Sequence, residues 1–171
     1  AKADINAACG NGWSPVIAAG FAGNTEVMQC LILSKAHLDV QQHCGSAGLT
    51  MAAEKGHFTV LFLLLQAKAD PNRADNLGFA PLAFACQEGH DANVELLLQF
   101  KANVNQPASN QVEPLLLAAK NGHVDVLKIL LRYKANIYAR NGPHGLAIDQ
   151  ARRKGHHKIV ELLASAAAPS E

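Results

Sequence analysis

The chain has 171 residues, a formal net charge of +1 and a sequence pI of about 7.9. Nucleic-acid-binding domains usually carry a clustered basic face and a much higher pI, so we expect no nucleic-acid partner. Apolar runs such as residues 60–65 are far shorter than the ~20 residues that a bilayer span needs. No basic start followed by an apolar stretch marks a secretory signal, and we therefore expect no membrane insertion.

The four cysteines are expected to be free thiols in a reducing compartment. None forms a Cys-x-x-Cys pair, and Cys30 and Cys86 fall at predicted helical core positions, where Cys behaves as a small apolar residue. This favours an intracellular protein, in the cytoplasm or alternatively the nucleus. Four cysteines alone would also allow two disulfides.

Two sequence markers return with a step of 33 residues. A Gly-His pair occurs at Gly56-His57, Gly89-His90, Gly122-His123 and Gly155-His156, with Gly23-Asn24 in the first copy. A Lys-Ala pair keeps the same step, with its lysines at Lys2, Lys35, Lys68, Lys101 and Lys134. Two independent markers that hold one period without insertions indicate a repeat array.

The period divides the chain into five repeats and the tail of a preceding one. The expected bounds are 1–8 for the tail, 9–41, 42–74, 75–107 and 108–140 for four repeats, and 141–171 for a fifth that acts as a C-terminal cap. Each repeat is predicted to hold two short antiparallel helices between turns. One pair cannot bury its apolar face alone, so we expect an all-α solenoid of stacked pairs.

Local signals predict where the helices begin and end. Ser14 should cap a helix that starts at Pro15 and is ended by Gly23, and Thr25 should cap the next one. The turn at 45–48 lacks a hydroxyl cap and a proline, so the helix after it should start less firmly. In the fourth copy Gln111 replaces the turn glycine, and Asn110 could supply a positive φ. The last copy shows no hairpin tail after Leu163.

The chain resembles the ankyrin-repeat family over essentially its whole length. The matching residues include Ser14-Pro15, Pro81-Leu82, Pro114-Leu115, Gly122-His123 and 102–105. The glycine of the family's tail is Lys in every copy. Because that glycine holds a left-handed backbone, Lys should cost up to about 1 kcal/mol per repeat. The lysines could instead form a basic binding ridge, although a solvated edge explains them as well.

The sequence predicts no catalytic, cofactor or metal site. The repeated histidines should lie about 10 Å apart, too far to share a zinc ion whose ligands stand at ~2.0–2.3 Å. We expect each of them to bond to the turn at the start of its helix. No phosphate loop or nucleophile elbow is present, and in ankyrin proteins catalysis generally comes from separate domains.

The resemblance implies that a protein or peptide partner binds the concave face, built from turn tips and the ends of the first helices. We expect a monomeric module. Carried over by repeat position, the candidate partner-binding residues are Trp13, Phe21, Ser46, Glu54, Lys55, Leu77, Phe79, Gln87, Glu88, Val112, Lys120 and Asn121. The apolar ones are notable because they occupy positions that the fold is expected to leave free, and Trp is a favoured interface anchor.

Two other functions are compatible with the sequence. The array could be a structural spacer or the targeting arm of a longer multi-domain protein. It could also be the substrate of an asparagine hydroxylase, as ankyrin repeats are as a family, at Asn6, Asn72 and Asn105. For structure alone, it suffices that each of these asparagines bonds its own hairpin.

Overall fold

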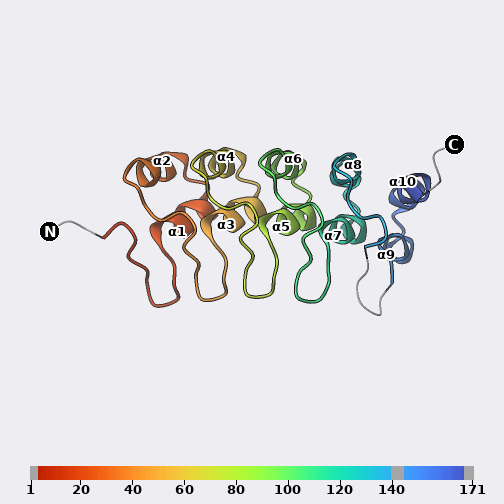
Figure 1. Cartoon of the computed structure of the whole chain (residues 1–171), viewed down its shortest axis with the longest axis horizontal. Coiled ribbons are helices and arrows are strands. Elements are labelled where there is room, and N and C mark those ends of the chain that lie inside the picture. Colours follow the sequence, from red (N-terminus) through yellow and green to blue (C-terminus); the bar gives the residue numbers. More distant parts are fainter. Residues whose placement is uncertain (1–3, 140–144, 168–171) are drawn as a thin grey trace.

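The computed structural model describes residues 4–139 and 145–167, and in this part of the chain ten α-helices form five pairs (Figure 1). The first helices of the pairs form an inner layer: α1 (Pro15–Ala22), α3 (Gly48–Lys55), α5 (Pro81–Glu88), α7 (Pro114–Asn121) and α9 (Ala147–Lys154). The second helices form an outer layer: α2 (Thr25–Leu33), α4 (Phe58–Gln66), α6 (Asp91–Gln99), α8 (Val124–Arg132) and α10 (His157–Ala167).

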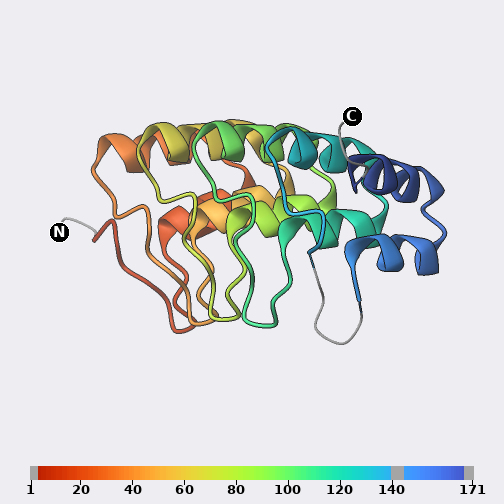
Figure 2. The same ribbon diagram turned by 45° about the vertical axis from the view of Figure 1, so that its right-hand side comes forward.

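The pairs stack side by side along the molecule. Each inner helix contacts the next inner helix, each outer helix contacts the next outer one, and the loops between pairs project from the inner layer (Figure 2). Extended pairing is confined to isolated bridges in the described ranges, such as the one between Gln41 and Ala47. The predicted all-α solenoid of stacked helix pairs is therefore confirmed.

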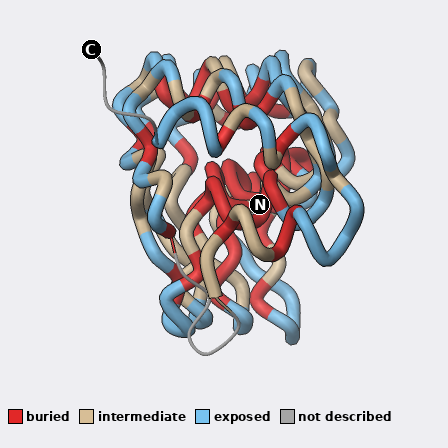
Figure 3. Tube along the Cα trace, turned by 90° about the vertical axis from the view of Figure 1, so that its right-hand side faces the viewer, coloured by how far each residue is buried: buried red, intermediate tan, exposed pale blue. Residues whose placement is uncertain are grey.

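The core lies between the two helix layers and runs the length of the stack (Figure 3). Its largest fully buried side chains include Leu49, Leu61, Leu64, Leu82, Leu97, Leu115, Leu127 and Leu130. Within the inner layer α1 and α3 approach closely, and a Cβ on Gly20 would stand 2.3 Å from the carbonyl oxygen of Gly48. Glycine at these two positions lets the backbones of the first two pairs approach.

The predicted helix starts are partly confirmed. Ser14 caps α1 by accepting the Ile17 N–H at 3.4 Å, and Gly23 ends that helix in a left-handed conformation. The prediction for Thr25 was wrong, because the Asn24 side chain accepts the Val27 N–H and Thr25 is the first residue of α2. The start of α3 has no side-chain cap, as expected, yet α3 is eight residues long, which is also the length of α1.

The four described lysines of the Lys-Ala series adopt left-handed backbone conformations, as the pattern predicts. Their φ angles lie between 59° and 68°. The N–H of Lys35 donates to Ile32 and that of Ala36 to Leu31, and the other three repeats make the same pair of bonds. This is the Schellman closure of a helix, with the buried alanine following the left-handed residue. Lys2 lies outside the described residues.

Two sequence-based expectations need correction. Gln111 itself takes the positive φ, at 64°, because it occupies the glycine position of the turn, and Asn110 instead accepts the Val112 N–H. Cys30 is exposed because it lies on the outward side of α2, whereas Cys86 is buried as expected. The expectation for the residues after Leu163 agrees with the structure: the described chain continues as helix through Ala167 without a hairpin, since the alanine-rich segment suits a helix.

The repeated histidines bond to the preceding repeat, not to their own turns. Nε2 of each donates to a carbonyl in the last turn of the previous inner helix. The pairs are His57 with Phe21, His90 with Glu54, His123 with Gln87 and His156 with Lys120, at 2.9–3.1 Å. Each imidazole also lies against the Gly at the end of that helix, where an added Cβ would stand within 3.0 Å of the ring. These histidines therefore connect neighbouring repeats.

The tail asparagines likewise connect repeats, so the expectation that each bonds its own hairpin was wrong. Oδ1 of Asn6, Asn72 and Asn105 accepts a backbone N–H 31 residues further on, at 2.7–2.8 Å. Asp39 makes the equivalent bond to Asp70 at 3.0 Å. The side-chain oxygen can reach the next tail because the 33-residue stack places equivalent hairpins side by side.

Candidate interaction face

The structure brings turn tips and inner-helix ends together on one surface, which we call the inner face. It is formed by the loop tips that project from the inner layer and by the last turns of α1, α3, α5 and α7. One hollow on it is lined both by tip residues, including Leu77 and Phe79, and by Gln87 of α5. The two groups of predicted site residues, far apart within each repeat, therefore share a surface.

Two of the predicted residues do not contribute to this surface. Val112 is 5% exposed and packs in the hydrophobic core, and Ser46 is 4% exposed. The expectation that the fold leaves Val112 free was wrong, because in the fourth turn the apolar side chain after Gln111 points into the stack. We exclude both residues from the candidate site.

Trp13 and Phe21 form an aromatic cluster at the N-terminal end of the inner face. Their ring centroids lie 5.4 Å apart in an edge-to-face arrangement, and the Lys55 ammonium stands 5.2 Å from the Phe21 ring. Lys55 also forms an ion pair with Glu54 at 2.8 Å, and this hydrogen bond raises its pKa. Phe21 stays 44% exposed, whereas Trp13 is half-buried.

An apolar hollow of about 530 Å³ lies in the third repeat. Leu77, Phe79 and Phe84 supply its apolar wall, and the rings of Phe79 and Phe84 stand 5.9 Å apart. Leu77 at the loop tip is 64% exposed. The Asp75 carboxylate accepts the N–H groups of Leu77 and Phe79, both at 2.9 Å, which fixes the tip that carries them.

Phe84 was missed by the sequence analysis. It lies one helical turn after Pro81 and one turn before Gln87, so helical spacing alone puts it on the same side of α5 as Gln87. Its aromatic character was the signal that could have identified it, but that signal is shared by core residues.

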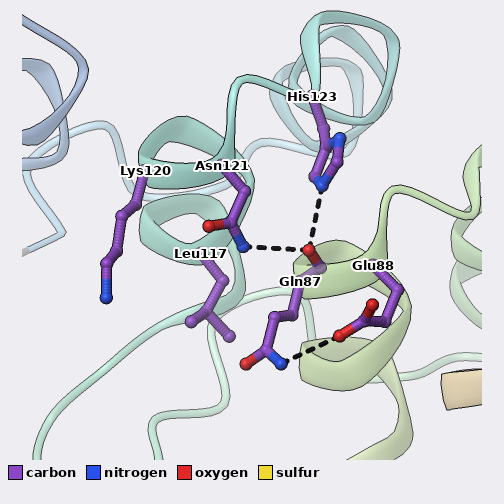
Figure 4. Close-up of a pocket in the computed structure, with 6 residues that line it drawn as sticks. All are labelled: Gln87, Glu88, Leu117, Lys120, Asn121 and His123. Atoms are coloured by element: carbon purple, nitrogen blue, oxygen red, sulfur yellow. Dashed lines mark hydrogen bonds between the residues drawn. The ribbon is translucent and has the colours of Figure 1, made fainter. Parts of the chain in front are cut away.

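A second hollow of about 530 Å³ adjoins the first and shares Gln87 with it. Figure 4 shows its wall between α5 and α7, where the Asn121 side chain and His123 both donate to the Gln87 carbonyl at 2.9 Å. The Gln87 side-chain amide donates to Glu88 at 3.0 Å. Lys120 lines the same hollow and has no ion-pair partner among the described residues.

The outer layer presents an apolar surface that the sequence analysis did not predict. Leu33 is 82% exposed, and Val27 and Phe58 are also exposed. Leu33 lines a shallow hollow of about 430 Å³ between α2 and α4, together with Leu63. This surface faces away from the candidate residues of the inner layer.

Neither a metal-ligand cluster nor a membrane-spanning helix occurs in the described ranges. No group of three or more His, Cys, Asp or Glu is placed to hold a metal ion. No described helix has both the length and the apolar character needed to cross a bilayer. Burial raises the pKa of the Cys86 thiol well above its ordinary value, which leaves that thiol protonated.

Comparison with known proteins identifies the repeat. A search of curated proteins found no similar sequence. A family model described as ankyrin repeats matches the chain in three overlapping copies, over residues 1–75, 49–141 and 102–170.

Proposed function

Because the chain belongs to the ankyrin-repeat family, we propose that it is a non-catalytic module that binds a protein or peptide partner on its inner face. Ankyrin repeats are generally protein–protein interaction modules. The observation that supports this face most directly is Leu77, an exposed leucine on a loop tip beside an apolar hollow. Covering a large exposed apolar side chain with a partner removes its surface from water, which lowers the free energy of the complex.

In the third hairpin, backbone and side-chain hydrogen bonds hold Leu77 exposed at the loop tip. Its tip is held by Asp75 and by the bond from the Asn76 N–H to the Cys44 carbonyl of the neighbouring hairpin, at 3.1 Å. Little ordering is then needed when a partner binds, which favours affinity. Burying a whole leucine contributes about 1.5–3 kcal/mol, so covering the exposed part of Leu77 should contribute about 1–2 kcal/mol.

The experiment compares capture by the wild-type chain with capture by two matched variants. Leu77→Asp places a charge on the inner face, and Leu33→Asp makes the same change at an exposed leucine of the outer layer. Immobilised proteins are incubated with cell lysate, and captured proteins are identified by mass spectrometry. Circular dichroism serves as the control that both variants keep the helical fold.

We expect at least one protein to be captured by the wild type and by Leu33→Asp but lost with Leu77→Asp. Loss with Leu33→Asp alone would place binding on the outer layer and refute the inner-face proposal. If no protein is captured specifically by the wild type, the alternative of a structural spacer or targeting arm is favoured.

A further inference from the structure

The charges on the inner face are distributed unevenly along the stack. In the second repeat Glu54 and Lys55 neutralise each other at 2.8 Å. In the third, the Glu88 carboxylate accepts from the Gln87 amide at 3.0 Å and interacts electrostatically with Lys55. In the fourth, Lys120 has no acidic partner within the part of the chain that the structure describes. Lys120 therefore stands in the second hollow without an ion-pair partner among the described residues, although Glu88 lines the same hollow.

The same trend continues into the fifth repeat. Lys154 occupies in α9 the position that Asn121 holds in α7, and it is exposed. The acidic residue of α9, Asp149, lies 3.7 Å from Arg152 and also accepts the Leu146 N–H. Lys154 makes no ion pair among the described residues. The inner face thus changes from apolar and neutral in the first repeats to basic in the last ones.

The apolar and the basic parts of this face meet at Gln87. This residue lines both the hollow of Leu77 and Phe84 and the hollow of Lys120. A ligand that fills the first hollow must therefore extend past Gln87 to reach the second. Figure 4 shows the Gln87 side chain directed toward Glu88, while the Lys120 side chain lies on the far side of Leu117.

We propose that the inner face recognises a linear peptide segment in which a large apolar side chain fills the Leu77–Phe84 hollow and an acidic side chain pairs with Lys120. This rests on the proposed function and names the chemistry of its partner. Helices in successive repeats lie about 8–10 Å apart, and an extended chain advances about 3.3 Å per residue. The acidic residue therefore stands about three positions from the apolar one.

The charge distribution also sets where on the inner face the acidic residue binds. Glu88 lines the α5 side of the hollow that holds Lys120 and repels a carboxylate there, so the acidic residue is accepted on the Lys120 side, beyond Leu117. Further acidic residues of the peptide would approach Lys154. Because charge complementarity steers association and discriminates among partners, it makes this end of the face selective.

The test begins with random linear peptides displayed on phage and selected on the immobilised wild-type chain. Enriched sequences are synthesised with a fluorophore, and their dissociation constants are measured by anisotropy. Three variants are compared: Leu77→Asp, Lys120→Glu and, as the matched control, Lys158→Glu on α10 of the outer layer. A second version of each peptide carries Lys in place of its acidic residue.

We expect enriched peptides to carry a large apolar residue and, about three positions away, Asp or Glu. Lys120→Glu should weaken binding of the acidic peptide about fivefold and strengthen binding of its Lys version, whereas Lys158→Glu should change neither. The effect of Lys120→Glu should shrink as salt is raised.

Two results would overturn this inference in different ways. If Leu77→Asp abolishes binding but Lys120→Glu leaves the preference for acidic peptides unchanged, acidic recognition by Lys120 is refuted and the proposed function stands. If neither Leu77→Asp nor Lys120→Glu changes binding of the enriched peptides, both the inference and the inner-face proposal are refuted.

Discussion

The left-handed lysines should limit the stability of the array, and replacing them by glycine tests this. Lys35, Lys68, Lys101 and Lys134 all have φ between 59° and 68° and all sit in the same Schellman closure. A left-handed conformation costs an L-residue about 1–2 kcal/mol. Glycine avoids this cost but loses about 0.5–1 kcal/mol more through unfolded-chain entropy. The net gain is about 0.5–1 kcal/mol per site.

The decisive comparison is between a variant with glycine and one with alanine at all four positions. Both variants remove the same charges and any attraction between the lysines and the helix C-termini, so their difference isolates the backbone conformation. The sites lie in different repeats, and their effects should add. We expect the glycine variant to exceed the alanine variant by about 2–4 kcal/mol in the free energy of unfolding.

Urea unfolding followed by circular dichroism measures this difference. Because repeat arrays can unfold in stages, the two variants must show the same slope with urea before their midpoints are compared. Equal stability of the two variants would show that the left-handed backbone carries no cost here, and the reasoning from φ would be refuted.

Three further predictions follow from single sites. Burial raises the pKa of Glu113 above its ordinary value of 4.5, against the opposing hydrogen bond from Asn136, and its Oε2 has no partner among the described residues. The folded state therefore holds the Glu113 proton more tightly than the unfolded state does, and the free energy of unfolding falls as pH rises through the folded pKa. Glu113→Gln should remove this pH dependence and raise the urea midpoint at pH 7. Gly20→Ala should lower the free energy of unfolding by about 1–3 kcal/mol, although alanine favours helix, because its Cβ would meet the Gly48 carbonyl. A more stable variant would contradict this close approach of α1 and α3. A thiol reagent should label the three exposed cysteines of the folded protein but label Cys86 only after denaturation, and rapid labelling of all four would contradict its burial.

The repeat period was sufficient to predict the architecture of this chain. A 33-residue step without insertions requires that equivalent residues fall at equivalent places, so one interpreted repeat gives all of them. The left-handed backbone at the lysines was predicted from the resemblance, because the family has a glycine at that position. Local capping was harder to predict, since Asn24 and Thr25 are adjacent and both can cap. Only the backbone conformation at the helix start decides between them.

Contacts between repeats were the part that the sequence did not reveal. His57 and Asn72 were both expected to bond within their own units, but each bonds to a neighbouring repeat. A side chain near a turn has local partners within reach, and sequence alone cannot show that the adjacent repeat brings a carbonyl or an N–H group closer. The burial of Val112 was missed for the same reason, because the neighbouring hairpins cover it.

The bonds between repeats also bear on recognition. The Gln87 carbonyl accepts from Asn121 and His123 of the next repeat, and Gln87 lines both hollows of the inner face. The relative position of Leu77 and Lys120 therefore depends on bonds that hold α5 against α7. A ligand that contacts both residues spans this boundary and should stabilise the two repeats as one unit. Loosening the boundary with His123→Ala should therefore weaken binding of an enriched peptide. An unchanged dissociation constant would show that the two hollows act independently.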